Sequence, residues 1–188
     1  MSLLVNNVFS FTGAGAPKGI PFWELPITLW DQFQHAGVRT HYVASVFAAP
    51  LMIAQRRGLI VNISSHGGAR YLFDVAYGVA MAAIDRLAAD MAQELRPYDV
   101  AAVSLWPWLV ETERVRAYPE YFAPQARPSA QFVGRAVVAL AADYKVMDKT
   151  GQVLLVPELA EAYGFTDIDG TRPPVAPEVA ALRASRRT

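Results

Sequence analysis

A serine and a tyrosine are the residues of this chain that could act together on a carbonyl group. Ser65 follows the apolar run Leu59–Ile63, and Tyr77 comes 12 residues later at the start of a helical pattern. A phenol with a pKa near roughly 10 is a poor acid at neutral pH unless a cation or a hydrogen bond stabilises its anion. The position one helical turn later could hold that cation, but it is Met81, which carries no charge. The alternative is structural, because such a tyrosine often packs half-buried and such a serine often caps a turn.

Apolar runs and the helical patterns between them could position these residues. The predicted strands are Leu3–Val5, Leu59–Ile63, Val100–Trp106 and Gly151–Val156, and helical patterns cover 30–57, 77–96 and 129–143. Strands that alternate with helices predict a parallel sheet, and their continuous apolar character indicates burial on both faces. The expected fold class is therefore α/β, a partial Rossmann-type sheet of about four strands with helices on both faces. Ligands of such sheets bind beyond the carboxyl ends of the strands, where Asn6, Ser65 and Pro107 fall.

The composition predicts one folded domain over 1–188, with a mostly irregular tail at 157–188. Of the 188 residues, 53% are hydrophobic and 18% are charged, which excludes extensive disorder. The 17 basic and 17 acidic side chains balance, so no nucleic-acid partner is expected. There is no cysteine, and His35, His41 and His66 lack the spacing of metal ligands, so no metal is expected. Without a long apolar run or a signal-peptide pattern, we expect no membrane association and a cytoplasmic location.

Four motifs resemble, in their order and spacing, those of the short-chain dehydrogenase/reductase family. They are Leu4-Val5-Asn6-Asn7, Ile60-Val61-Asn62-Ile63-Ser64-Ser65, Tyr77-Gly78-Val79-Ala80-Met81 and Pro107-Trp108-Leu109-Val110-Glu111-Thr112. The segments 85–90 and 163–170 are similar to those of one subgroup, called dehydrogenase/reductase SDR family member 1. The resemblance covers nearly the whole chain and is to the C-terminal part of the family fold. It implies a Rossmann-type sheet and hydride transfer between NAD(P)H and a small carbonyl compound or alcohol.

The resemblance also implies roles for individual residues. In the family the tyrosine is the acid/base and the serine orients the carbonyl, which makes Tyr77 and Ser65 the catalytic candidates. A lysine four residues after the tyrosine lowers the pKa of the phenol and holds the nicotinamide ribose. A Pro-Gly-x-Val-x-Thr element closes over the nicotinamide. The cofactor-binding candidates are Asn6, Pro107, Val110 and Thr112.

Several departures from the family pattern affect the binding of NAD(P). The lysine is replaced by Met81, and a thioether can neither donate to ribose hydroxyls nor stabilise a phenolate. The family's glycine after the proline is replaced here by Trp108. Gly37 stands where many family members carry an asparagine. We expect the chain to begin at the family's fourth strand, without the Gly-rich phosphate-binding half. The glycines of Thr12–Ala16 follow the wrong strand for that role.

These observations leave three hypotheses for the function. The first is a degenerate member of the family that lacks normal NAD(P)-dependent activity and retains a role in binding or assembly. The second is an active oxidoreductase with an altered cofactor site or one supplied by a partner, because Ser65 and Tyr77 are retained. The third is a hydrolase that uses Ser65 with His66. The absence of a G-x-S-x-G elbow and the opposite directions of adjacent side chains disfavour it.

Homo-oligomerisation is expected from the same resemblance. The strand at Leu3–Asn6 is expected to form a bare sheet edge, and an apolar edge favours association. The helices around Val43–Met52 and Tyr77–Leu95 correspond to the usual dimer faces of the family. We therefore predict a dimer or tetramer rather than a free monomer.

Overall fold

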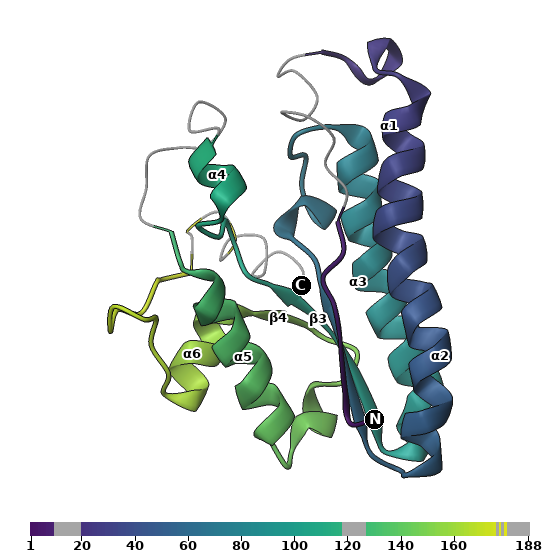
Figure 1. Ribbon diagram of the computed structural model, residues 1–188, viewed down its shortest axis with the longest axis vertical. Helices are drawn as coiled ribbons and strands as arrows, with labels where there is room; N and C mark the ends of the chain where they lie inside the picture. Colours follow the sequence, from purple (N-terminus) through teal and green to yellow (C-terminus); the bar gives the residue numbers. More distant parts are fainter. Residues whose placement is uncertain (10–19, 118–126, 176, 178, 180–188) are drawn as a thin grey trace. The chain divides into compact units, whose positions relative to one another are not determined.

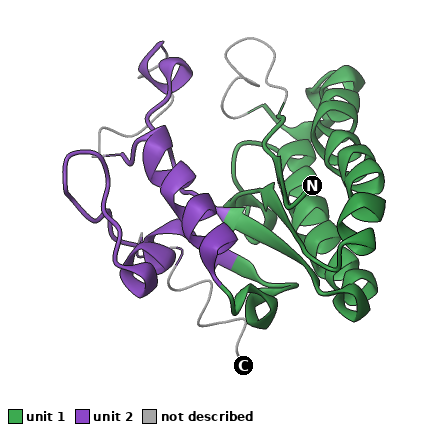
Figure 2. Cartoon of the chain, turned by 60° about the horizontal axis from the view of Figure 1, so that its bottom comes forward, with its two compact units in different colours: residues 1–105, 144–153 green, residues 106–143, 154–188 purple. Residues whose placement is uncertain are grey.

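The computed structural model describes residues 1–9, 20–117, 127–175, 177 and 179. It divides the chain into two compact units, one formed by 1–105 with 144–153 and the other by 106–143 with 154–188 (Figure 2). The single domain over 1–188 stays a prediction. The glycines of Thr12–Ala16 lie outside the described residues.

The described strands form one sheet with the order β1-β2-β3-β4. Their bounds are β1 Leu3–Asn6, β2 Gly58–Ile63, β3 Val100–Trp106 and β4 Val153–Leu155. Strand β2 pairs in parallel with both β1 and β3, and Ile60 lies opposite Leu4 on one side and Ala102 on the other. All of β3 is buried, as its largely apolar sequence predicts. The α/β class with a parallel, four-stranded Rossmann-type sheet is therefore confirmed. The expected burial of Leu3–Val5 on both faces is wrong, because Leu3 and Val5 are exposed on the edge strand β1.

Two long helical segments lie side by side in the first unit (Figure 1). The helical pattern at 30–57 forms α1, a π-helical turn and α2, and the pattern at 77–96 forms α3. Their bounds are α1 Ile27–Gln32, the π-turn Phe33–Arg39, α2 Thr40–Ala54 and α3 Val75–Leu95. The π-turn contains Gly37, a weak helix former, and the hydroxyl of Thr40 donates to the carbonyl oxygens of Ala36 and Gly37.

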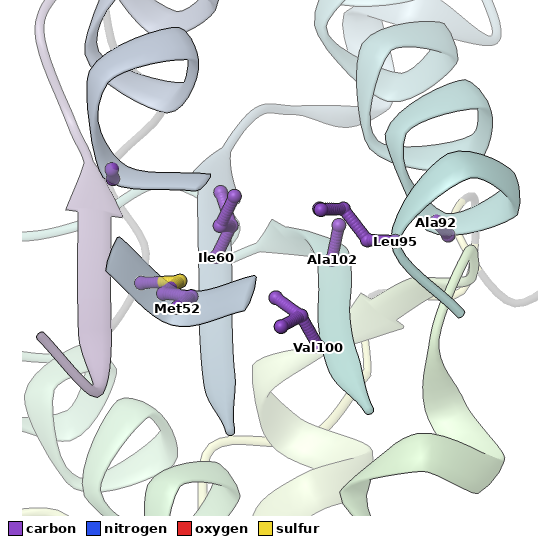
Figure 3. Packing of buried hydrophobic residues seen from close by; sticks show 7 residues of the cluster. Met52, Ile60, Ala92, Leu95, Val100 and Ala102 are labelled. Carbon is purple, nitrogen blue, oxygen red and sulfur yellow. The ribbon is translucent and has the colours of Figure 1, made fainter. Parts of the chain in front are cut away.

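A hydrophobic cluster joins α2 and α3 to strands β2 and β3 (Figure 3). Met52 and Ile60 are both fully buried in it. A Cβ atom at Gly58 would lie 2.5 Å from the side chain of Met52, so the glycine allows this side chain to lie against β2. The buried members of the cluster are Ala48, Met52, Ile60, Ala92, Leu95, Val100 and Ala102.

Further helices lie in the described part of the second unit. They are α4 Glu113–Ala117, α5 Ala130–Ala142 and α6 Val156–Tyr163. Ser129 caps α5 by accepting a hydrogen bond from the N–H of Phe132 at 3.2 Å. The side chain of Asp167 in turn accepts hydrogen bonds from the N–H and the hydroxyl of Ser129. Burial raises the pKa of Asp167, but these bonds outweigh it and hold the pKa below its usual value.

The expectation of a mostly irregular tail from residue 157 onward needs a correction at its beginning. Helix α6 covers 156–163, and Pro157 lies in its first turn, where a proline removes no intrahelical hydrogen bond. Gly164 ends the helix in the left-handed conformation, with a φ of 76°. The irregular tail therefore begins only after this helix. Within the described part of the chain, no helix is long and apolar enough to cross a membrane.

Candidate active site

Ser65 lies directly beyond the carboxyl end of β2. The strand ladder continues to Ser64, whose N–H donates to the carbonyl oxygen of Leu105 at 3.0 Å. Ser65 then caps a short 3-10 turn, His66–Gly68, because its Oγ accepts the N–H of Gly67 at 3.1 Å. The serine therefore does cap a turn, as the structural alternative expected, but this bond leaves its hydroxyl proton available to a second partner.

Tyr77 lies in the first turn of α3 and is positioned by the cap of that helix. The carboxylate of Asp74, which is buried, accepts the backbone N–H of Tyr77 at 2.8 Å. The Tyr77 hydroxyl then lies 2.6 Å from the Oγ of Ser65. The fold thus brings the two catalytic candidates into direct hydrogen-bond contact, while their roles in a reaction stay predictions.

Two glycines of the 3-10 turn permit this close approach. A Cβ atom at Gly67 would lie 2.4 Å from Cε1 of Tyr77 and 3.1 Å from the Oγ of Ser65. A Cβ atom at Gly68 would lie 2.8 Å from the backbone nitrogen of Ala82 in α3. A larger residue at either position would therefore push the turn away from the helix that carries the tyrosine.

The substitution Gly67→Ala should separate Ser65 from Tyr77 and lower the free energy of unfolding by about 1–3 kcal/mol. The matched control is Gly78→Ala, because a Cβ atom there would meet the carbonyl oxygen of Gly67 at an ordinary 3.4 Å. Gly78 lies inside α3, where alanine is favoured over glycine, so this variant should gain about 0.5–1 kcal/mol. Urea unfolding of both variants measures the difference, and equal stabilities would contradict the close approach described above.

The surroundings of Tyr77 keep its hydroxyl protonated. Burial raises the pKa of Tyr77 to about 12, and although the hydrogen bond with Ser65 lowers it in part, the carboxylates of Asp74 and Asp85 raise it further. The ring is also enclosed by aromatic side chains packed edge to face. The centroids of Phe9, Phe33 and Phe73 lie 5.6, 6.0 and 5.1 Å from that of Tyr77.

Met81 occupies the position one helical turn after Tyr77. Its side chain is only 4% exposed, and its sulfur atom lies 3.9 Å from the Oγ of Ser64. The Ser64 hydroxyl also donates to the carbonyl oxygen of Met81 at 3.1 Å. The space beside the tyrosine on this turn is thus filled by a packed, uncharged thioether.

Asn6, the first cofactor-binding candidate, connects strands and helix within the first unit. Its Nδ2 donates to the Oδ1 of Asn62 at 2.8 Å, to the Oγ of Ser45 at 3.1 Å and to the carbonyl oxygen of His41 at 3.4 Å. All four residues are buried. These bonds give Asn6 a structural role between β1, β2 and α2, and its contact with a cofactor stays a prediction.

The other cofactor-binding candidates belong to the second unit. Thr112 begins α4, because its Oγ1 accepts the N–H of Val115 at 3.2 Å. Pro107 is buried, and Val110 is half-buried. Trp108 has a φ of 69°, in the left-handed region that favours glycine. Among the described residues, no group of three or more His, Cys, Asp or Glu side chains is arranged to hold a metal ion.

Comparisons with known proteins place this geometry in a family. A family model described as short chain dehydrogenase matches residues 2–121. The chain belongs to the short-chain dehydrogenase family. It is 42% identical over 187 residues to dehydrogenase/reductase SDR family member 1 of Mus musculus, covering 90% of this chain and 59% of that protein. For the protein of the same name from Homo sapiens the identity is 39% over 191 residues, with the same coverage. The chain thus spans about three-fifths of the length of these relatives.

Solved structures show the same fold. A 3-oxoacyl-[acyl-carrier protein] reductase with bound NAD from Brucella melitensis has a TM-score of 0.67 and 25% identity, over 82% of this chain and 60% of that chain. Acetoin dehydrogenase from Enterobacter cloacae has a TM-score of 0.66 and 24% identity, over 82% of this chain and 62% of that chain. ElxO with NADP bound reaches a TM-score of 0.71 at 21% identity, over 82% of this chain and 65% of that chain.

The cofactor of short-chain dehydrogenases is NAD(P), and the residues around Tyr77 can be tested for their fit to it. The family's lysine would donate hydrogen bonds to the ribose, but Met81 has no donor and its sulfur already packs against Ser64. This side of the site therefore does not fit the nicotinamide ribose.

Trp108 stands where the short-chain dehydrogenase pattern has glycine, and its left-handed backbone agrees with that glycine preference. Replacement by glycine should therefore be better tolerated than replacement by alanine. We expect Trp108→Gly to exceed Trp108→Ala in free energy of unfolding by about 1 kcal/mol, since both remove the indole and only alanine retains the strain. Thermal unfolding of the two variants checks this, and a more stable alanine variant would contradict it.

Some site residues were missed by the sequence analysis. Asp74 carries a readable signal, because an aspartate directly before an apolar helical pattern is a typical N-cap. Gly67 could not be identified from the sequence, because its contact with Tyr77 depends on tertiary packing. Phe73 gave no signal, because neither its positive φ nor its contact with Tyr77 follows from sequence spacing.

Proposed function

We propose that the chain is a degenerate short-chain dehydrogenase. Its Ser65–Tyr77 pair binds the oxygen of a small carbonyl compound or alcohol, but it lacks the family's normal NAD(P)-dependent hydride transfer. The observation that carries this proposal is Met81, whose packed thioether fills the place of the family's lysine. The chain belongs to a family of oxidoreductases, and we propose that it has lost the activity of that family.

Binding of a carbonyl oxygen is supported by the hydrogen-bond pattern of the pair. The N–H of Gly67 donates to Ser65, so the Ser65 hydroxyl can direct its own proton toward a ligand. The Tyr77 phenol is protonated at neutral pH, because its pKa of about 12 lies far above 7. When a carbonyl oxygen binds, the two hydroxyls, which lie 2.6 Å apart, can exchange their mutual hydrogen bond for two bonds to that oxygen and hold it in a fixed orientation.

Proton transfer by the same pair is disfavoured. A general acid works best when its pKa lies near the working pH, and a phenol at about 12 holds its proton far too tightly. The reverse role is disfavoured too, because very little phenolate is present at neutral pH to accept a proton from an alcohol. The carboxylates of Asp74 and Asp85 raise the pKa of Tyr77 further, and the uncharged Met81 does not lower it.

The second candidate function is an active NAD(P)-dependent oxidoreductase with an altered or partner-supplied cofactor site. It is favoured by one observation, the direct contact between Ser65 and Tyr77. Under this alternative, a cation from another chain would lower the pKa of the phenol.

Carbonyl-dependent oxidation of NADPH by the wild-type chain and by Tyr77→Phe separates the two candidates. The proposal predicts that both proteins oxidise NADPH at the same background rate, since the tyrosine transfers no proton. Turnover by the wild type that Tyr77→Phe abolishes would establish the alternative instead. A fluorescence titration with NADH and NADPH adds a second readout, and micromolar affinity would overturn the proposal.

We also propose that the chain forms a homo-oligomer, either a dimer or a tetramer. Helix α2 presents an exposed apolar face formed by Tyr42, Val46, Phe47 and Leu51, and Phe47 is 75% exposed. Exposed apolar patches of this kind mark interaction surfaces. Sedimentation equilibrium tests the proposal, and a monodisperse species of 20.6 kDa at micromolar concentration would contradict it.

A cytoplasmic location is the last part of the proposal, and imaging of a fluorescent fusion tests it.

A further inference from the structure

Phe73 is an exposed aromatic residue that lies beside the Ser65–Tyr77 pair. Its ring meets that of Tyr77 edge to face, with the centroids 5.1 Å apart and an angle of 87° between the planes. Phe33 packs against the same tyrosine but is only 1% exposed, and Phe9 is half-buried. Phe73 is 41% exposed, so of these rings it offers the most surface to a ligand.

The backbone at Phe73 is strained. Its φ is 62°, and the N–H of Asp74 donates to the carbonyl oxygen of Leu72 at 2.9 Å across it. This bond closes a three-residue turn around a positive φ, which is a rare and unfavourable arrangement for a bulky residue. Glycine would adopt the same conformation without that cost. A phenylalanine at this position therefore indicates a use for the ring that offsets the strain.

Hydrogen bonds hold the strained turn on both sides. The Tyr71 hydroxyl donates to the carbonyl oxygen of Phe73 at 3.3 Å. On the other side, Asp74 accepts the N–H of Tyr77 at 2.8 Å, so one short segment orients both the Phe73 ring and the tyrosine. Tyr71 is itself 74% exposed and adds a second aromatic surface from the same segment.

We propose that Phe73 is a specificity-determining residue and that the ligand carries a flat apolar ring next to its carbonyl or hydroxyl group. This inference rests on the proposed function, in which Ser65 and Tyr77 hold the oxygen of that group. The ring of Phe73 packs against that of Tyr77, with the centroids 5.1 Å apart, so a substituent that extends from the bound carbon along the tyrosine ring would meet Phe73. Aromatic pairs gain from offset or edge-to-face packing beyond simple burial, which favours a ring over an alkyl chain.

Two methyl ketones with eight carbons each, acetophenone and 2-octanone, are suitable probes. Their affinities for the full chain can be measured by NMR titration. Phe73→Gly and Phe73→Ala should both weaken the binding of acetophenone roughly 3- to 10-fold, and that of 2-octanone less. The two variants lose the same ring but differ in backbone strain, so Phe73→Gly should be the more stable protein. Both variants should lose the preference for acetophenone over 2-octanone to the same extent.

The matched control is Tyr98→Ala. Tyr98 is also 41% exposed, but it follows the far end of α3, so its loss should leave both affinities unchanged. Retention of the wild-type preference for acetophenone in Phe73→Gly would overturn the inference. The proposed function would still stand if Tyr77→Phe weakened the binding of both ketones, and it would fail if that variant bound them as tightly as the wild type. A wild-type chain that binds neither ketone would overturn both.

Discussion

Replacing Met81 by lysine should raise the rate of NAD(P)H-dependent carbonyl reduction about 10²- to 10⁴-fold over that of Met81→Leu. An ammonium group one helical turn from Tyr77 would stabilise the phenolate and lower the pKa of the tyrosine from its value of about 12. It would also supply the donor that the thioether lacks. Initial rates with a fixed carbonyl substrate and the same high concentration of NADPH for both variants provide the measurement.

The controls for this experiment separate charge from packing. Met81→Leu keeps an apolar side chain of similar volume and should behave like the wild type, with a stability change below about 1.5 kcal/mol. A lysine at a position only 4% exposed will cost stability, so circular dichroism must first establish that the Met81→Lys variant is folded. A folded variant with a lowered pKa of Tyr77 and an unchanged rate would contradict the assignment of the loss of activity to Met81.

The second large effect is expected in the core. Ile60→Ala should lower the free energy of unfolding by about 2–5 kcal/mol, because Ile60 is fully buried between α2, α3 and the neighbouring strands (Figure 3). The same substitution at Ile168, which is 61% exposed, should change the stability by less than about 0.5 kcal/mol. Urea denaturation measures both. Equal effects at the two positions would contradict the packing of the cluster.

The strands and their parallel arrangement could be predicted from the sequence because each strand is a short, largely apolar run between helical patterns. Strand β3 has the predicted bounds Val100–Trp106, and Ser129 caps α5 as predicted. Helix α3 begins two residues earlier than predicted, at Val75, because the capping effect of Asp74 was not recognised. Local patterns therefore determined most of the elements and left errors mainly at their ends.

Other features depend on contacts that sequence spacing does not encode. The π-turn at 33–39 has the same apolar pattern as an ordinary helix, and the weak helix former Gly37 alone did not indicate a π-turn. Pro157 starts α6 although prolines usually end helices, and only its place in the first turn makes the difference. The pairing of Ser65 with Tyr77 was predicted, but its dependence on Gly67 became apparent only from the distance between the turn and the ring.

The ionisation of Tyr77 tests the central claim most directly. Labelling the tyrosines with ¹³C at Cζ and assigning Tyr77 by comparison with Tyr77→Phe gives its pKa from a pH titration. The raised pKa also predicts that stability falls as the pH rises from about 10 toward 12, since the unfolded chain ionises this tyrosine first. We predict a Tyr77 pKa of about 12 in the wild-type chain. A pKa below the ordinary value of about 10 would show that a cation acts on the phenol, and it would contradict the account.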